Sequence, residues 1–465
     1  MPAVSAAYHQ RFRPPRYLVG AGIAGFVVLL VVIASLASAV FSGALLEVFL
    51  YGLPAVALLL AGTVFAIRAF VDPPGTKRAD EVRAGVLLGL GLVFWLLVAE
   101  ASFMFSGSSP AVVVGCAIAC LPTTGFGLWF VRRLDRNEKE PWRLVLVAAV
   151  WGAIVATTMA LWGNTLWDVL FTSRIPPGSA ANVSVGLSAG DIEEISKGLA
   201  VLLLYLVVRD EFDGVVDGII YGAIVGLGFN YMESILYMSR AYVTAQQEGG
   251  GGTLGAGFQW FIRQVLDLFF GHATYTALTG AGIGLARQMA RRWPKVLMIV
   301  CGFVSAIAAH LIWDAWVAQA TIQTANTGVL VLELIVRELA GNAGFTAVVI
   351  LLLGMGLRAE GDALAGHLEE EAELGAGAVL PQEVRLLRSP WRRLVERSDA
   401  AVRGGPKAWL AISRLRTAQL DLAMERWHRE RKVLDAPQQA EDLLRRRVLT
   451  LRQRAAPSLA LLAHR

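Results

Sequence analysis

Four apolar stretches in the middle of the chain carry ionisable side chains that could do chemistry within a membrane. These residues are Glu193, Glu194, Lys197, Glu233, His272, His310 and Asp314. A charged group inside a bilayer is costly unless it is paired or hydrated, so such residues usually mark a functional site. Two histidines and a carboxylate suit a zinc ion, with a further glutamate as general base for the bound water. A reaction without metal fits the same residues, with a glutamate that activates water and a histidine that stabilises the oxyanion.

The spacing of these residues adds detail. Lys197 follows Glu193 by four residues and Glu194 by three, so on a helix it can neutralise either carboxylate. Neighbouring glutamates point about 100° apart on a helix, which predicts that one faces the histidines and the other faces the lysine. Asp314 follows His310 by four residues and shares its helix face. There it could ligate a metal or orient the histidine.

The elements that must position these side chains are membrane-spanning helices. The 465 residues are 55% hydrophobic and 17% charged, whereas soluble chains carry about 25% charged residues. The mean hydropathy is +0.55, and the apolar runs have the length of about 20 residues that crosses a bilayer. The sequence predicts an all-α, polytopic membrane helix bundle of about ten transmembrane helices. The predicted spans are 17–41, 45–67, 84–105, 110–131, 144–163, 191–208, 214–237, 262–285, 296–319 and 338–357.

The distribution of basic residues predicts the orientation. Arg11, Arg13 and Arg16 precede the first span, and most other Lys and Arg between the spans fall in the even-numbered loops. The positive-inside rule then puts both termini in the cytoplasm. With this topology, the ionisable side chains of spans six to nine lie between the outer face and the midplane. Residues 164–190 and 238–257 are expected to be outer loops.

The chain divides into four predicted parts: residues 1–109 with three spans, 110–320 as the core with the ionisable cluster, 321–357 with the last span, and 358–465 as a basic cytoplasmic tail. The tail carries 20 Lys and Arg against 15 Asp and Glu. Its helical spacing, interrupted by prolines, predicts a solvated helical tail or a helix at the membrane surface, with no nucleic acid as partner. Cys116 and Cys120 lie one helical turn apart in an apolar run and are expected to pack in the core.

Several motifs together resemble the PrsW family of bacterial intramembrane proteases. They are Glu193-Glu194-x-x-Lys197, Phe229-x-x-x-Glu233, His272, His310-x-x-x-Asp314, a glycine-rich segment from Asp217 to Phe229, and Asp135-x-x-Glu138-x-Glu140-Pro141. The resemblance covers about residues 110–320. The family often has Asn where this chain has Ser234. The first three spans and the tail lie outside the resemblance.

The resemblance implies an intramembrane endopeptidase of the bacterial cell membrane. Its partner would be a membrane-anchored protein substrate in the lipid bilayer, which in the best-known member of the family is an anti-sigma factor. By this resemblance, Glu193 and Glu194, with Lys197, are the catalytic residues. Glu233, His272, His310 and Asp314 become metal ligands, with zinc as the expected metal, or polar supports.

Two other functions fit the ionisable cluster. A proton-coupled transporter or channel also uses intramembrane Glu and His, often with interrupted helices and inverted repeats. No repeat is evident in this sequence, and the cluster lies to one side of the midplane, which favours hydrolysis. The third alternative is a catalytically inactive sensor with the same fold.

The remaining acidic residues of the apolar stretches are expected to have lesser roles. Asp217 is expected to cap a helix, and Glu338 is expected to be solvated. Asp267 could be a polar partner that orients His272. Glu100 could contact the site but belongs to no motif. The glycines at positions 222, 226 and 228 predict close helix packing, as small residues permit in lipid.

Overall fold

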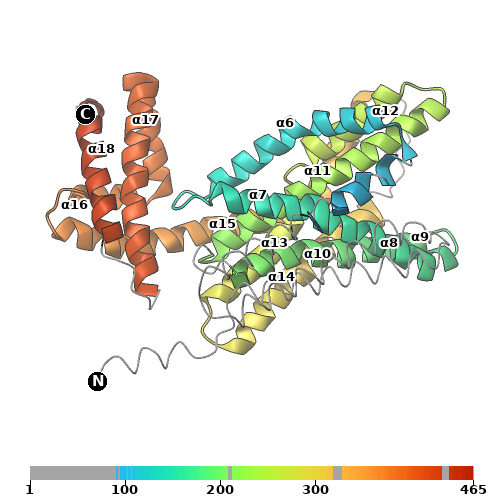
Figure 1. Ribbon diagram of the computed structural model, residues 1–465, viewed down its shortest axis with the longest axis horizontal. Helices are drawn as coiled ribbons and strands as arrows, with labels where there is room; N and C mark the ends of the chain where they lie inside the picture. Colours follow the sequence, from blue (N-terminus) through green and yellow to red (C-terminus); the bar gives the residue numbers. More distant parts are fainter. Residues whose placement is uncertain are drawn as a thin grey trace. The chain divides into compact units, whose positions relative to one another are not determined.

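The fold is helical throughout the part of the chain that the structure, a computed structural model, describes. That part comprises residues 89, 91–92, 95–101, 103–105, 107–207, 212–317, 327–431 and 439–463. Figure 1 shows the arrangement. The α-helices are α6 (Pro110–Leu134), α7 (Trp142–Val150), α8 (Thr157–Leu170), α9 (Ser179–Ser188), α10 (Glu194–Val207), α11 (Val215–Gln247), α12 (Gly252–Phe261), α13 (His272–Gln288), α14 (Arg292–Ile312), α15 (Thr327–Glu373), α16 (Pro381–Leu387), α17 (Pro390–Arg431) and α18 (Gln439–Ala463).

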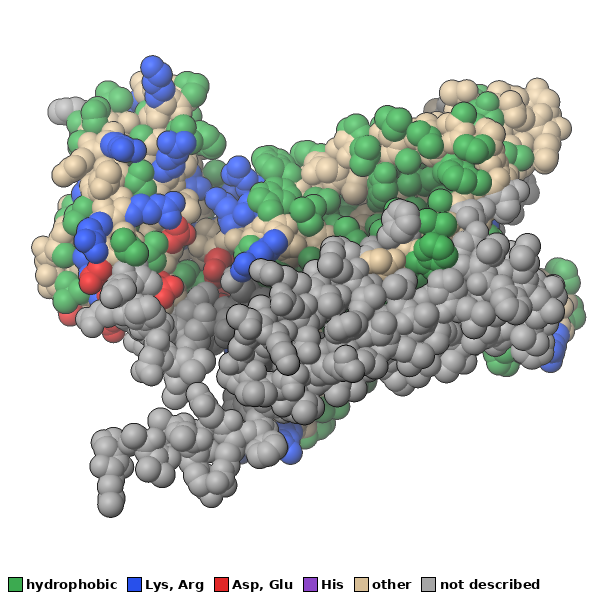
Figure 2. Space-filling view, in the orientation of Figure 1, with side chains coloured by type: hydrophobic (Ala, Val, Ile, Leu, Met, Phe, Trp, Pro, Cys, Tyr) green, Lys and Arg blue, Asp and Glu red, His purple; other side chains and the backbone are tan. Residues whose placement is uncertain are grey.

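Five helical segments among the described residues are long and apolar enough to cross a membrane. They are Pro110–Leu134, Trp142–Arg174, Val215–Gln247, Arg292–Ala315 and Gly328–Glu373. These segments confirm the predicted all-α membrane architecture. The predicted spans 17–41 and 45–67 lie outside the described residues, so the number of ten spans stays a prediction. On the face shown in Figure 2, hydrophobic side chains cover much of α6, as expected of a helix that contacts lipid.

The described residues form two compact units. The first comprises those up to Val131 together with Pro141–Val349, and the second comprises Arg132–Glu140 and Ile350 onwards. Within the first unit, α11 is the central helix: it packs along α13 and α12 and against α7, while α13 also contacts α10 and α14. Side chains from Val215 to Asn230 of α11 are all buried. The ionisable residues of α10, α11, α13 and α14 therefore meet around one central helix.

Glycines let α11 and α13 approach each other as closely as the motif predicted. A Cβ at position 222 would lie 2.3 Å from the backbone oxygen of Thr276, and a Cβ at position 226 would lie 2.2 Å from that of His272. Gly228 allows an equally close contact with Ala149 of α7. The predicted close packing at these three positions is confirmed. Because Gly226 contacts the backbone of His272, this packing also fixes the position of a candidate site residue.

Substitution Gly226→Ala is expected to destabilise the protein by about 1–3 kcal/mol, because the added methyl group forces α11 and α13 apart. It should also reduce activity more than this loss of stability alone, since His272 must move. The matched control is Gly125→Ala in α6, where a Cβ meets nothing within 4 Å. Thermal unfolding in detergent and a cleavage assay check both effects. Equal stability of the two variants would contradict the packing argument.

Two segments expected to be outer loops are largely helical. Residues 164–190 contain the end of α8 and all of α9, and residues 238–257 contain the end of α11 and the start of α12. Only residues 248–251 separate α11 from α12. Gly186 packs against Leu311 and Ala315, and Gly190 packs against the backbone of Ile307. Small residues that have weak helix propensity are thus held in a helix by close packing on α14, which local sequence does not reveal.

Helix geometry changes next to the ionisable residues. π-Helical turns cover Ala189–Glu193, Ile262–Leu266 and Trp313–Val317, and such turns are frequent at functional sites. The predicted span 262–285 is interrupted, because residues 267–271 are not helical and α13 begins at His272. His272 is therefore the first residue of a helix and not an interior position of a continuous span.

The second unit is a packed helical unit and not merely a solvated tail. Buried apolar side chains of α17 and α18 form its core, with Ile412, Leu415, Leu422 and Val448 almost inaccessible. Pro381 and Pro390 begin α16 and α17, where a missing N–H does no harm. Gly405 bends α17 with a φ of 68°. The prolines that were expected to break the tail thus define where its helices begin.

A buried ionic network ties α16 to α17 and α18. Glu383 Oε1 accepts hydrogen bonds from Arg416 Nη1 at 2.6 Å and from Arg452 Nη1 at 3.0 Å, and its Oε2 accepts from Gln419 Nε2 at 3.0 Å. Burial raises the pKa of Glu383, but the hydrogen bonds and charges of Arg452 and Arg416 outweigh it and lower the pKa from 4.5 to about 2. The charged form is therefore the one that stabilises the fold.

The stability of this unit is expected to depend on Glu383. Because its folded pKa is depressed, its contribution of about 3 kcal/mol is present above pH 4.5 and lost as the pH falls towards 2. At pH 7, Glu383→Gln should remove a similar amount, whereas Glu369→Gln, at an exposed position, should remove almost none. Hydrogen exchange of the α16–α18 peptides in the intact protein measures the difference. Equal protection in the two variants would contradict the role of Glu383.

Candidate active site

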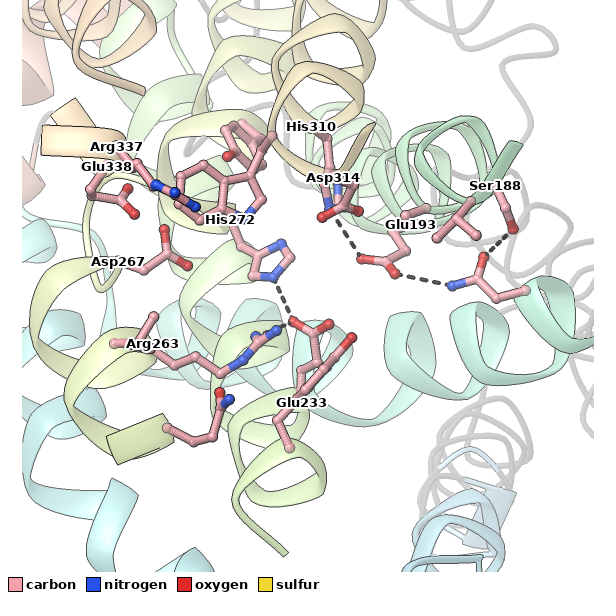
Figure 3. Close-up of a pocket in the computed structure, with 18 of the residues that line it drawn as sticks. Ser188, Glu193, Glu233, Arg263, Asp267, His272, His310, Asp314, Arg337 and Glu338 are labelled. Atoms are coloured by element: carbon pink, nitrogen blue, oxygen red, sulfur yellow. Dashed lines mark hydrogen bonds and ion pairs between the residues drawn. The ribbon is translucent and has the colours of Figure 1, made fainter. Parts of the chain in front are cut away.

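A cavity of about 560 Å³ brings together most of the ionisable residues singled out from the sequence. Its walls include Glu193, Glu233, His272, His310 and Asp314, which come from the α9–α10 segment, α11, α13, α14 and the turn after α14 (Figure 3). Glu194 and Lys197 are fully buried next to it. Four stretches that are distant in sequence thus place their polar side chains around one space.

Lys197 is the buried cation of the site. Its Nζ lies 2.7 Å from Glu194 Oε1, 3.4 Å from Glu193 Oε2 and 3.0 Å from His272 Nδ1. The ammonium also lies 3.9 Å from the ring centroid of Phe229, a favourable cation–π position. A lysine without solvent contact is tolerated here because two carboxylates offset its charge.

The two neighbouring glutamates have different environments. Glu194 is saturated, because its Oε1 contacts Lys197 and lies 3.0 Å from His310 Nδ1, while its Oε2 accepts a hydrogen bond from Thr276 at 3.2 Å. Glu193 lines the cavity, and its Oε2 lies 3.8 Å from His310 Nε2. The sequence predicted that one glutamate faces the histidines and that the other faces Lys197. The structure instead shows one fully buried carboxylate, Glu194, and one that faces the cavity, Glu193.

The two histidines lie side by side, with ring centroids 5.1 Å apart. His272 Nε2 is 2.6 Å from Glu233 Oε2, and His310 Nε2 is 3.3 Å from Asp314 Oδ2. The second contact confirms that the four-residue spacing puts Asp314 on the face of His310. Each imidazole is thus oriented by carboxylates, the arrangement that fixes ring position and tautomer in many active sites.

Asn164 and Arg263 belong to the site but were not predicted from the sequence. Asn164 Nδ2 donates to Glu193 Oε1 at 3.1 Å, and Ser188 Oγ donates to Asn164 Oδ1 at 2.7 Å. Arg263 Nη1 donates to Glu233 Oε2 at 2.8 Å. Both residues lie near the ends of predicted spans, where polar side chains normally contact water. The only feature of the sequence that could have indicated a role was a polar residue next to an apolar run.

Two other acidic residues, Asp217 and Glu338, have well-defined surroundings. Asp217 caps α11 by accepting the backbone N–H groups of Asp213 and Gly214, as expected. Glu338 is 4% exposed and lines the cavity, so the expectation of a solvated residue is wrong. The cause is a hydrogen bond from Asn342 one turn later on α15, at 2.7 Å, which turns the carboxyl group inwards.

Glu100 contacts the site through a second cavity of about 350 Å³. This cavity shares Glu193 and Glu233 with the first and has mostly apolar walls. The Oε1 of Glu100 accepts hydrogen bonds from Thr157 at 2.5 Å and Thr158 at 2.8 Å. Glu193 and Glu233 therefore have accessible space on two sides, the first cavity with the histidines and the second cavity with Glu100.

The residues of the site fit a metal ion. Glu193, His272 and His310 each offer one ligand atom, these atoms lie within 4.8 Å of one another, and all three residues are buried. A carboxylate and two imidazoles are a donor set that zinc accepts. The Nδ1 of His310 is held by Glu194, which leaves Nε2 directed towards Glu193. To bind a metal through Nε2, His272 would have to exchange its hydrogen bond to Glu233 for the metal.

Comparisons with known proteins point to one family. The family described as PrsW family intramembrane metalloprotease matches residues 140–353. Protease PrsW of Geobacillus kaustophilus (strain HTA426) is 29% identical over 184 residues, which are 40% of this chain and 68% of that protein. No solved structure gives a significant match. The matched segment contains every ionisable residue that lines the cavity, so residues 140–353 are similar to the PrsW family of intramembrane metalloproteases over the whole candidate site.

Proposed function

We propose that the protein hydrolyses a peptide bond of a membrane-anchored protein, with Glu193 as the general base. One observation carries this proposal: of the paired glutamates, Glu193 alone lines the cavity, and it does so beside both histidines. Glu194 has no oxygen left for a reacting molecule. This distinction assigns the two glutamates of the motif to separate tasks, a reacting carboxylate and a buried partner of Lys197 and His310.

The reaction needs one proton transfer in each direction. Glu193 takes a proton from a water molecule in the cavity while the water oxygen attacks the peptide carbonyl carbon. The same carboxyl group then gives the proton to the amide nitrogen as the C–N bond breaks. Asn164 holds Glu193 Oε1, which leaves Oε2 for this task, and Lys197 lies beside that oxygen as the neighbouring positive charge.

A metal ion held by Glu193, His272 and His310, for which zinc is the proposal, would supply Lewis-acid polarisation of the carbonyl and a more acidic water. In that case Glu193 would be a ligand and not the base, and Glu233, which already contacts His272, would take the proton from water. Arg263 holds Glu233 in place through its hydrogen bond. Asp314 orients His310 through Nε2 when no metal is bound; with a metal on that nitrogen, Glu194 would orient the ring through Nδ1.

The two cavities support a peptide substrate that passes Glu193 in an extended form. The second cavity is lined by Phe103, Met232 and Leu236, among others, which suit the side chains of a membrane-spanning segment. The first cavity, with its histidines and carboxylates, suits the end of that segment, where the chain meets water. In the proposed topology, with both termini cytoplasmic in a bacterial cell membrane, the cleavage would occur near the outer leaflet. A membrane-anchored regulator such as an anti-sigma factor has the required form.

The interrupted helix before His272 is the observation that favours a proton-coupled transporter as the second candidate. One experiment separates the two functions. The protein is placed in liposomes that contain a pH-sensitive dye and labelled single-span test proteins, with His310→Ala as the comparison. A protease releases fragments without proton flux, and His310→Ala abolishes the release. Proton flux that depends on His310, with no fragments from any test protein, would refute the proposal.

A further inference from the structure

Two carboxyl groups that the proposed reaction does not use lie in the wall of the first cavity. Asp267, in the interruption before α13, and Glu338, on α15, both line this cavity and are 8% and 4% exposed. Their side chains are within hydrogen-bonding reach of each other. Figure 3 shows the two carboxyl groups directed towards each other beside His272. We call Asp267 and Glu338 the acidic pair.

Neither member of the acidic pair forms an ion pair with a residue in the described part of the chain. Arg263 and Arg337 also line the cavity, but Arg263 bonds to Glu233 at 2.8 Å and Arg337 bonds to Glu333 at 2.5 Å. The Oδ1 of Asp267 is buried and accepts no hydrogen bond. An unpaired buried carboxylate oxygen is rare in proteins, and here it belongs to a side chain in a cavity wall.

The surroundings hold the acidic pair firmly in place. Asn342 donates to Glu338 Oε1 at 2.7 Å and accepts a hydrogen bond from the Tyr275 hydroxyl group at 2.7 Å. The ring of Tyr275 stacks on His310, with centroids 5.1 Å apart. Gly271 leaves room for the Asp267 carboxylate, since a Cβ there would lie 2.1 Å from Oδ1. The pair is therefore a preformed feature that is connected to the histidines through one aromatic ring.

We propose that the acidic pair is a specificity subsite that binds a positively charged side chain of the substrate, a lysine or an arginine near the scissile bond. This inference rests on the proposed protease function. A guanidinium or ammonium group in the cavity would donate to the carboxyl groups of Asp267 and Glu338. Such charge-assisted hydrogen bonds are strong in a site that excludes water. A neutral side chain would leave two carboxyl groups to be desolvated without compensation.

The subsite is tested first without a substrate. Benzamidinium serves as the cationic probe and benzamide as its neutral match, and binding is followed by the fluorescence of Trp167 and Trp313, which line the same cavity. The wild type should bind benzamidinium in preference to benzamide. Asp267→Asn should weaken benzamidinium binding about 10- to 100-fold, because it removes a charged hydrogen bond. Glu248→Gln, at an exposed position near the end of α11, is the control and should bind as the wild type does.

Glu338→Gln gives an independent variant in case Asp267→Asn does not fold, and thermal unfolding in detergent checks both. Equal benzamidinium binding by the wild type and by a folded variant of either residue would overturn the subsite. So would equal binding of benzamide and benzamidinium by the wild type.

The second test uses cleavage. A single-span test protein carries lysine or methionine at successive positions near the cleavage site. The wild type should show a lower KM for one lysine position, and Asp267→Asn should raise that KM about tenfold or more, so that the difference in KM between the lysine and methionine forms is lost. A lysine preference that persists in Asp267→Asn overturns the subsite. If benzamidinium binding depends on Asp267 but no test protein is cleaved, the proposed protease function fails while the cation site stands.

Discussion

Substitution Glu193→Gln is expected to reduce cleavage by about 10³-fold or more while the protein stays folded. Glutamine keeps the size of the side chain and can still accept from Asn164, but it cannot take a proton from water, and general base catalysis contributes about 10²–10⁴-fold. Since Glu193 borders the cavity, the loss of its charge is compensated by solvent more easily than at a closed position. Activity should therefore fall without a comparable fall in stability.

The neighbouring residue provides the comparison. Glu194→Gln removes a fully buried carboxylate that contacts Lys197, His310 and Thr276. It should lower both activity and stability, the latter by about 3–5 kcal/mol, because a buried lysine loses its closest partner. Cleavage rates and thermal unfolding in detergent for both variants give the result. A Glu193→Gln protein that cleaves at the normal rate, or two variants with the same stability, would rule out the assignment of the two glutamates.

Substitution Lys197→Met is expected to have the largest effect on stability at the site. The methionine fills a similar volume, but it removes the ammonium group that contacts Glu193, Glu194 and the Nδ1 of His272. Breaking a buried ion pair on one side costs about 3–5 kcal/mol, and here two carboxylates are left. Cleavage should also be lost, because His272 and Glu193 are no longer held in position.

The control for this variant is Lys407→Met, which removes an exposed positive charge from α17 and should leave stability within about 0.5 kcal/mol. Thermal unfolding in detergent compares the two. A Lys197→Met protein as stable as the wild type would mean that Glu193 and Glu194 do not need the lysine for neutralisation. It would contradict the role of Lys197 as the cation that offsets both carboxylates.

The main members of the cluster could be predicted from the sequence because a charged group in an apolar run is costly unless it is paired or hydrated. Lys197 contacts both glutamates, and Asp314 contacts His310, as helical periodicity requires. The family resemblance pointed to the same residues. The predicted all-α membrane fold is likewise a direct consequence of hydropathy, since only helices and closed barrels satisfy their backbone within lipid.

The sequence did not predict the features that depend on packing between distant helices. The π-helical turn at Ala189–Glu193 falls where the sequence predicts the change from a loop to a span. The break at residues 267–271 is not visible in hydropathy, because it contains Leu268, Phe269 and Phe270. Glu338 was misjudged because its position at the start of a span is typical of solvated residues. Its orientation depends on Asn342 and on the cavity, which exist only in the folded protein.

Asn164 and Arg263 were missed for a related reason. A polar residue close to the end of an apolar run ordinarily lies at the membrane interface. Only the contacts of Asn164 with Glu193 and of Arg263 with Glu233 reveal a role at the site. The same reasoning applies to Asp267, whose unpaired oxygen becomes evident only when its neighbours are known.

The most direct test of the proposed metal centre is the metal content of the protein purified in detergent without a His tag. The wild type and a His272→Ala/His310→Ala variant are measured by mass spectrometry, and thermal unfolding confirms that both are folded. We expect about one zinc ion per chain in the wild type and none in the variant. A wild-type protein that cleaves its substrate fully without any bound metal, or a variant that keeps the metal, would contradict the proposal that Glu193, His272 and His310 form a metal centre.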